Sequence, residues 1–278
     1  MVSSTEQESR RGARHPLQQI SKGERVVIVG TGEWGATMLE YFAYDTPHEV
    51  VAFSTEAPFM TSDAYCGLPV VPLEELAKAY PPADFRAFVA VSKTQLNRVR
   101  RRVHGAVKDM GFDCLSYVSS HAFILPSAEI GENTLVQENS AVEFRVRVGS
   151  RVSIGAGVCV GHSSVIEDDC SLGPHVAVSG NCTIGHGSFL GTNCSIADWI
   201  KVAEDCIIGA GAVVVKDTEP GQVYVGNPAR PTGRSSYVTA GVENLRHRGG
   251  GEFPGMRPTC AVIYASHMQG RKRQYNVL

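Results

Sequence analysis

The sequence predicts a small α/β domain followed by a parallel β-helix, with an extended segment at the C-terminus. Two observations predict this fold class. Aliphatic residues repeat every six positions through the second half of the chain, and a glycine-rich loop separates a strand pattern from a helix pattern near residue 30. We divide the chain into a disordered leader (1–23), the α/β domain (24–119), the β-helix (120–230) and a C-terminal extension (231–278).

Composition narrows the class of protein. The 278 residues carry a formal net charge of −2, which gives no electrostatic reason to expect nucleic acid or a membrane surface as a partner. No apolar run approaches the roughly 20 residues that span a bilayer. The polar leader of mixed charge lacks the apolar core of a targeting sequence. The eight cysteines form no CxxC pair and no metal-ligand spacing, so we expect a reduced, cytoplasmic compartment and no metal.

The glycine loop has the context of a nucleotide-binding site. An apolar run, 26–29, precedes Gly30-Thr-Gly32-Glu-Trp34-Gly35, and a helical pattern and a second strand, 50–53, follow. This order predicts a Rossmann-like domain in which the loop lets a phosphate approach the helix N-terminus. We expect Gly30, Gly32, Trp34 and Gly35 to bind substrate, with Glu56 a candidate for a ribose or base. A turn that only packs tightly, and a solvated Glu56, are the alternatives.

The remainder of this domain reads as alternating strands and helices. Residues 68–80 predict a strand and a helix, residues 85–111 predict another strand and a basic helix, and 114–118 predict a last strand. We interpret the arginines of the basic helix as a solvated face. They are Arg98, Arg100, Arg101 and Arg102.

The repeat of six predicts the second domain. Every sixth residue from Ile124 to Val214 is Ile, Leu or Val, without exception. A helical period of about 3.6 cannot sustain this pattern, whereas short strands that turn a corner every six residues can. Three such strands make a triangular coil, and coils stack about 4.8 Å apart with the aliphatics inside. Cysteines that recur at 170, 182, 194 and 206 fall in the small inward column, so we interpret them as core thiols and not metal ligands.

The order of domains and the repeat motifs resemble a known family. The loop GTGEWG, the repeats from SAEIGENTLV, the segment SSVIEDDCSLG and the closing AGAVVVKD and VYVGNPAR resemble the hexapeptide-repeat sugar acyltransferases, of the bacillosamine N-acetyltransferase and sialic-acid O-acetyltransferase type. The resemblance covers about residues 25–230. It implies a left-handed β-helix and a homotrimer. It also implies acetyl-CoA or another acyl-CoA as co-substrate between neighbouring β-helices, and transfer of the acyl group to an amine of a nucleotide-linked sugar near the glycine loop. We expect Gly209, Gly211 and Asn227 to lie at the CoA groove.

The sequence departs from the family pattern at its centre. The family places its catalytic histidine in the order aliphatic, any residue, His, acidic residue, Cys; this chain reads Ile166-Glu-Asp168-Asp-Cys, with Asp168 at the histidine position. A second family histidine, nine residues further on, corresponds to Ala177. One hexad is also missing beside Val178 relative to the family.

The repeat register suggests where another base could lie. Residues eighteen apart stack, which places His186 about 5 Å above Asp168, and a carboxylate beside an imidazole orients a general base. We therefore predict His186 as the base, oriented by Asp168. His162 and His175 project from other faces and are candidates for substrate binding across a trimer interface. For each histidine, an exposed or interface residue without a catalytic role is the alternative.

Two other interpretations of the whole chain stay open. The missing family histidines are also compatible with a member that has lost transfer chemistry and acts as a ligand-binding or scaffold protein. The same prism could also support a cyclisation, transfer from a donor other than CoA, or a metal site between subunits that resembles the γ-class carbonic anhydrases. The C-terminal extension contains one strand-like segment, 260–266, which is apolar enough to pack on another surface.

Overall fold

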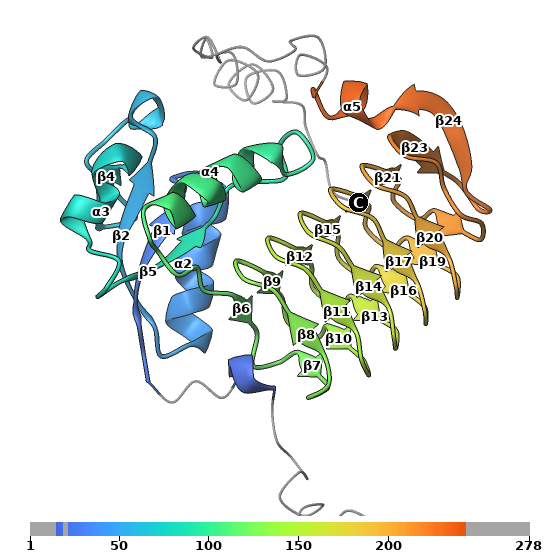
Figure 1. Ribbon diagram of the computed structural model, residues 1–278, viewed down its shortest axis with the longest axis horizontal. Coiled ribbons are helices and arrows are strands. Elements are labelled where there is room, and N and C mark those ends of the chain that lie inside the picture. The colour runs from blue at the N-terminus through green and yellow to red at the C-terminus, as the bar shows by residue number, and fades with distance from the viewer. Residues whose placement is uncertain (1–14, 19–21, 243–278) are drawn as a thin grey trace, which may run out of the picture. The chain divides into compact units, whose positions relative to one another are not determined.

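The computed structural model describes residues 15–18 and 22–242 (Figure 1). Both predicted domains are present within them. The strand predicted at 260–266 and most of the predicted leader lie outside the described residues.

The α/β domain is built on a five-stranded sheet with the order β3-β4-β2-β1-β5. β1, β2, β4 and β5 run parallel, and β3 pairs with β4 in the antiparallel sense. The elements are η1 (Pro16–Gln18), β1 (Arg25–Val29), α2 (Glu33–Asp45), β2 (Glu49–Thr55), η2 (Ala57–Phe59), β3 (Ala64–Tyr65), β4 (Leu68–Pro72), η3 (Leu73–Glu75), α3 (Leu76–Ala79), β5 (Arg86–Val89) and α4 (Arg98–Asp109).

The central strand β1 is buried on both faces. Val26 and Ile28 pack in a cluster that includes buried residues of α2, whereas Val27 and Val29 pack in a cluster that includes buried residues of α4. This is the two-residue alternation of a strand covered on both sides. β1 lies between β2 and β5, so the chain order reverses beside it. The carboxyl ends of strands at such a reversal form the crevice in which open α/β sheets bind ligands.

The β-helix consists of two-residue strands joined by tight corners. Each strand pairs in parallel with the strand one coil later, for example Ile166 with Ile184, and Figure 1 shows the coils stacked one on another. The strands are β6 (Tyr117–Val118), β7 (Phe123–Ile124), β8 (Glu129–Ile130), β9 (Leu135–Val136), β10 (Ala141–Val142), β11 (Arg147–Val148), β12 (Ser153–Ile154), β13 (Cys159–Val160), β14 (Val165–Ile166), β15 (Ser171–Leu172), β16 (Ala177–Val178), β17 (Thr183–Ile184), β18 (Phe189–Leu190), β19 (Ser195–Ile196), β20 (Lys201–Val202), β21 (Ile207–Ile208) and β22 (Val213–Val214).

Three sheets form the faces of the prism, and their strands are parallel except for the last pair, β23 (Gln222–Val225) and β24 (Arg230–Ser235), which is antiparallel. Their strand orders are β22-β19-β16-β13-β10-β7, β20-β17-β14-β11-β8, and β24-β23-β21-β18-β15-β12-β9-β6. The predicted aliphatic column fills the interior: every member is buried in one cluster except Ile130, which is partly buried against it. The coils continue through Val178, which pairs with Val160 on one side and Ile196 on the other.

The two ends of the prism are closed in different ways. β23 (Gln222–Val225) and β24 (Arg230–Ser235) continue one face to residue 235, and α5 (Ser236–Thr239) follows. At the other end, His15 is buried and its Nε2 lies 3.1 Å from the Ala128 carbonyl, while the Gln18 amide donates to the carbonyls of Ser119 and Ala122. The prediction of disorder over 1–23 is therefore wrong for His15–Gln18, which cover the first coil.

The junction between the domains also differs from the prediction. Tyr117 and Val118, which we expected in the α/β sheet, pair with Leu135 and Val136 and so begin the β-helix. Cys114 alone makes a parallel bridge to Ala87 of β5. No helix among residues 15–18 and 22–242 combines the length and apolarity that a bilayer crossing requires.

Candidate active site

One corner of the β-helix carries the predicted catalytic residues. The turn after β14 contains Asp168 and the turn after β17 contains His186, and the strand register stacks these turns. The Gly187 amide donates to the Asp168 carbonyl over 3.0 Å, which fixes the two turns directly above one another. The predicted stacking of Asp168 and His186 is therefore present in the backbone.

The Asp168 carboxylate, however, turns toward the coil on the side away from His186. Its Oδ1 accepts from the Ser150 amide at 2.8 Å, and its Oδ2 lies 2.9 Å from Nη2 of Arg151. Within the described part of the chain, no hydrogen bond or ion pair joins the side chains of Asp168 and His186. Asp168 therefore does not orient the imidazole as we predicted.

Asp169 is the carboxylate that faces the His186 ring. Its Oδ2 lies 3.7 Å from Nδ1 of His186, and its side chain is only 2% exposed. Asp169 is the left-handed residue of its corner, with φ of 60°, and this conformation separates its side chain from that of Asp168. The repeat register identified the right coil but not which of two adjacent carboxylates points to the ring.

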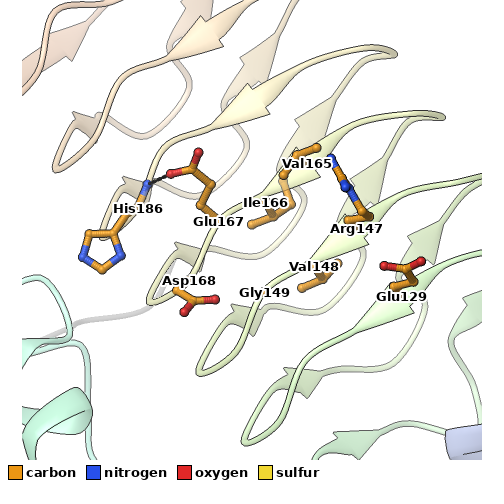
Figure 2. Close-up of a pocket in the computed structure, with 9 residues that line it drawn as sticks. All are labelled: Glu129, Arg147, Val148, Gly149, Val165, Ile166, Glu167, Asp168 and His186. Carbon is orange, nitrogen blue, oxygen red and sulfur yellow. Dashed lines mark hydrogen bonds between the residues drawn. The ribbon is translucent and has the colours of Figure 1, made fainter.

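The other contacts of His186 define its tautomer. Nε2 lies 2.8 Å from Nη1 of Arg101. A guanidinium group can only donate, so Nε2 accepts and Nδ1 carries the proton toward Asp169. The His186 backbone amide donates to the Glu167 carboxylate at 2.8 Å (Figure 2). A hydrogen bond thus holds the ring at Nε2 and another holds the backbone, while Nδ1 faces the Asp169 carboxylate.

Cations surround Asp169. Arg151 donates to it from Nε at 2.8 Å and from Nη2 at 3.1 Å, and Arg101 lies 3.9 Å away. Burial alone would lower the pKa of Arg151, but hydrogen bonds and charge from Asp169 and Asp168 outweigh burial and raise it. Burial lowers the pKa of the neighbouring Arg100 to about 10, and the charge of Asp169 opposes this change. Asp169 is therefore a buried anion that several arginines compensate.

An open pocket lies over this corner and the adjoining sheet (Figure 2). Its volume of about 430 Å³ lies within the range of small-molecule sites. The lining residues are Glu129, Arg147, Val148, Gly149, Val165, Ile166, Glu167, Asp168 and His186. Three carboxylates outnumber the one arginine of this lining, so the pocket suits a cationic group such as a substrate ammonium.

The basic helix α4 docks on the β-helix through two of its four predicted surface arginines. Arg98 lies 2.7 Å from Asp205, and Arg100 is buried and donates to the Ser153 hydroxyl at 2.7 Å. The prediction of a solvated face is therefore wrong for Arg98 and Arg100, whose partners lie on β-helix coils far along the chain, whereas Arg101 and Arg102 are exposed. The helix begins after Asn97, whose side chain donates to the Ser171 hydroxyl at 2.8 Å.

Two glycines of the loop, Gly30 and Gly35, are closely packed against backbone, whereas Gly32 has open space beside it. A Cβ on Gly30, where φ is +131°, would lie 2.6 Å from the Ala90 carbonyl oxygen, and a Cβ on Gly35 would lie 2.1 Å from the Gly30 carbonyl oxygen. These two glycines are required for the strand–helix turn itself. Gly32, at the start of α2, has no atom within 4 Å of a Cβ position. Gly32 therefore leaves backbone accessible at a helix N-terminus.

Two of the predicted substrate contacts in this domain have partners within the chain. Trp34 is partly buried against the core cluster beside α2. The Glu56 carboxylate accepts from both Nη1 and Nη2 of Arg102, at 2.8 and 2.9 Å. A ribose would have to compete with this bidentate ion pair for Glu56.

The other predicted site residues lie apart from this corner. His162 follows β13 and His175 follows β15, so they occupy the two other corners of the prism; both are exposed. Gly209 and Gly211 belong to the turn after β21, and the exposed Asn227 precedes a cis peptide bond to Pro228. A single chain does not bring these residues to the pocket at His186.

The cysteines of the inward column are core thiols, as predicted. Cys170, Cys182, Cys194 and Cys206 are buried in the aliphatic cluster, and burial raises the pKa of Cys194 to about 12. Within residues 15–18 and 22–242, no group of three or more His, Cys, Asp or Glu side chains is placed to hold a metal ion.

Comparisons with known proteins agree with this architecture. Residues 181–216 match the family described as bacterial transferase hexapeptide (six repeats). The acetyltransferase domain of PglB from Neisseria gonorrhoeae FA1090 is 27% identical, with a TM-score of 0.68, over 75% of this chain and 99% of that domain. PerB from Caulobacter crescentus, in complex with CoA and GDP-perosamine, is 28% identical, with a TM-score of 0.65, over 75% of this chain and 97% of its own.

A third structure, WeeI from Acinetobacter baumannii AYE, shares the fold at 23% identity and a TM-score of 0.58, over 76% of this chain and all of its own. Among curated protein sequences, none matches. The predicted fold class, a Rossmann-like domain followed by a left-handed parallel β-helix, is confirmed, and so is the resemblance to hexapeptide-repeat acetyltransferases.

Proposed function

We propose that this chain transfers an acyl group from acyl-CoA to an amine of a small, nucleotide-linked sugar. The observation that carries the proposal is the similarity to PerB, whose structure holds CoA and GDP-perosamine, and to the PglB acetyltransferase domain, which also has a structure with acetyl coenzyme A. These matches cover nearly the full length of PerB and of the PglB acetyltransferase domain. They therefore include the glycine-loop domain as well as the β-helix.

In this reaction the amine nitrogen attacks the thioester carbonyl, and the thiolate of CoA leaves from the tetrahedral intermediate. A base must take a proton from the amine before or during the attack. We assign this role to His186, the imidazole of the pocket. Asp169, 3.7 Å from Nδ1, would stabilise the positive charge that the ring acquires.

Asp168 has a different role in this proposal. A carboxylate is intrinsically a much weaker base than an amine, so it is poorly suited to take a proton from the substrate ammonium. Asp168 is half exposed and lines the pocket together with Glu167. Both carboxylates would attract the substrate ammonium and hold it near His186.

The nucleotide and CoA would occupy two further regions. The open backbone at Gly32, beside the strand-order reversal, suits the phosphates of the nucleotide sugar. We place CoA in a groove near Gly209, Gly211 and Asn227, which a neighbouring β-helix in a homotrimer would complete. His162 and His175, at the other corners, could reach such a groove only from another subunit. The cytoplasm, where we expect these thiols to stay reduced, is the proposed location.

The direct test is a transfer assay with purified protein. Acetyl-CoA and longer acyl-CoA donors would be combined with GDP-perosamine and with UDP- and dTDP-linked aminosugars, while thiol release and the acylated sugar are followed. The proposal predicts thiol release that depends on the aminosugar and an amide product found by mass spectrometry. Thiol release that is the same with and without the acceptors would reject it.

A second candidate is a ligand-binding protein without transfer chemistry. The observation that favours it is that both groups that could act as a base are engaged, Asp168 by Arg151 and the His186 lone pair by Arg101. This candidate predicts thermal stabilisation by a nucleotide sugar and none by any acyl-CoA. Stabilisation by both ligands would favour the transferase.

A further inference from the structure

Arg101 forms a hydrogen bond with the ring nitrogen of His186 that a general base would use to accept a proton. A neutral imidazole takes up a proton through the lone pair of its unprotonated nitrogen. In this structure that nitrogen is Nε2, and Nη1 of Arg101 lies 2.8 Å from it. The other nitrogen carries a proton and faces Asp169. His186 cannot accept a substrate proton until the guanidinium group moves.

Arg101 differs from its neighbours on α4 in its freedom to move. Arg98 is held 2.7 Å from Asp205, and Arg100 is buried with hydrogen bonds to Ser153 and to the Arg151 carbonyl. These contacts anchor α4 to the β-helix independently of the position of the Arg101 side chain. The Arg101 side chain is 49% exposed. Its displacement would therefore leave the anchoring contacts intact.

The backbone connects Arg101 to the nucleotide crevice. β5 ends beside the glycine loop, where the Ala90 carbonyl closely approaches Gly30. Residues 90–97 then lead from this crevice to the first turn of α4. A phosphate is a stronger partner for a guanidinium group than a neutral imidazole is, because it is anionic and accepts two parallel hydrogen bonds.

We propose that Arg101 is a positioning residue that caps Nε2 of His186 in the free protein and moves onto a phosphate of a bound ligand. This inference rests on the proposed function for its purpose, since the ligand would be the nucleotide sugar or CoA. The movement frees the His186 lone pair only when the site is loaded. Nδ1 continues to face the Asp169 carboxylate, so the released nitrogen is the one that faces away from it.

The first test measures the lone pair directly. Diethyl pyrocarbonate acylates unprotonated imidazole nitrogens, and mass spectrometry of peptides gives a rate for each histidine. Arg101→Ala should raise the rate at His186 about tenfold, the order expected for loss of a hydrogen bond from a charged donor. The rates at the exposed His162 and His175 should not change and serve as internal references. Equal rates at His186 in the two proteins would overturn the cap.

The second test follows the displacement by long-range proton–nitrogen NMR of histidine-labelled protein, with His186→Gln for assignment. The nitrogen chemical shift of His186 Nε2 in Arg101→Ala gives the value for a ring without the arginine hydrogen bond. Labelled wild-type protein is titrated with nucleoside diphosphates (UDP, GDP and dTDP) in one arm of the experiment and with CoA in the other. A shift of the wild-type signal toward the uncapped position is expected, and the arm that causes it identifies the source of the phosphate. No shift with any of these ligands would overturn the displacement.

Neither test uses acyl transfer as its readout. A protein that shows both effects but forms no amide product would keep the cap and reject the proposed function. Transfer activity together with an unchanged His186 rate in Arg101→Ala would reject the cap alone. The half-exposed position of Arg101 means that this variant should fold, which a thermal unfolding curve would verify.

Discussion

The imidazole of His186 lies 3.7 Å from the carboxylate of Asp169, while Asp168, its register neighbour one coil away, forms an ion pair with Arg151. Two adjacent carboxylates therefore have separate environments. Asp169 is 2% exposed and surrounded by arginines, whereas Asp168 is 49% exposed and lines the pocket. Asp169 thus compensates buried charge, whereas Asp168 faces the substrate pocket.

Asp169→Asn should destabilise the protein, because it removes the anion that compensates the buried Arg100 and the partly buried Arg151. Breaking a buried ion pair on one side typically costs about 3–5 kcal/mol. Asp168→Asn is the matched control, since Asp168 is half exposed and should contribute about 1 kcal/mol or less. Urea unfolding of both variants measures the difference. Equal midpoints for the two would contradict the assignment of Asp169 as the structural anion.

Stability should fall in mild acid because two buried histidines resist protonation. Burial lowers the pKa of His48, and Nδ1 of this residue accepts a hydrogen bond from the Glu24 amide. Burial, with the charge of Arg151, also lowers the pKa of His104, and this outweighs Glu132 at 3.5 Å. The unfolded chain then binds more protons than the folded one below about pH 6.5.

The stability that these histidines contribute is complete above their unfolded pKa of about 6.5 and is lost as pH falls through the lower folded pKa. Thermal unfolding between pH 7.5 and 5 should show a decline in wild type that is smaller in the His48→Gln, His104→Gln double variant. The pKa of Asp45, which its hydrogen bonds to Ser120 and Tyr117 lower despite burial, acts only at more acidic pH. Parallel profiles for the two proteins would refute this account.

Two glycines of the loop, Gly32 and Gly35, should respond differently to alanine. Gly32→Ala has open space and a φ of −88°, so it should fold with unchanged stability and weaken nucleotide-sugar binding by crowding the helix N-terminus. Gly35→Ala should instead lower the thermal midpoint, because its Cβ would collide with the Gly30 carbonyl. Calorimetric titration and thermal unfolding separate the two effects. Unaltered affinity in Gly32→Ala would argue against a ligand at this loop.

The β-helix could be predicted in detail because its signal is local and repeated. Each aliphatic of the six-residue column points into the prism, so the pattern alone fixed the strands, the coil length and the stacking of residue 168 on residue 186. The same reasoning identified the cysteine column as core.

The site was less predictable because its contacts come from the other domain and from corner geometry. The repeat register cannot tell that the left-handed Asp169 turns toward His186 while Asp168 turns toward Arg151. Nor does composition show that Arg101 of the basic helix reaches His186, 85 residues away in the chain. The sequence pattern of arginines on a helix is the same whether their side chains are exposed to solvent or paired with a buried carboxylate. Packing of the two domains decides between these outcomes.

The most direct measurement is the acyl-transfer rate of His186→Ala with saturating acyl-CoA and the best nucleotide aminosugar. If His186 is the base, kcat should fall by about 10²–10⁴ with little change in the KM for the sugar, the loss typical of removing a general base. His162→Ala, at another exposed corner, is the control for loss of a histidine. A His186→Ala enzyme that keeps wild-type kcat would contradict the claim that His186 is the general base. The base would then be a group outside this corner of the β-helix.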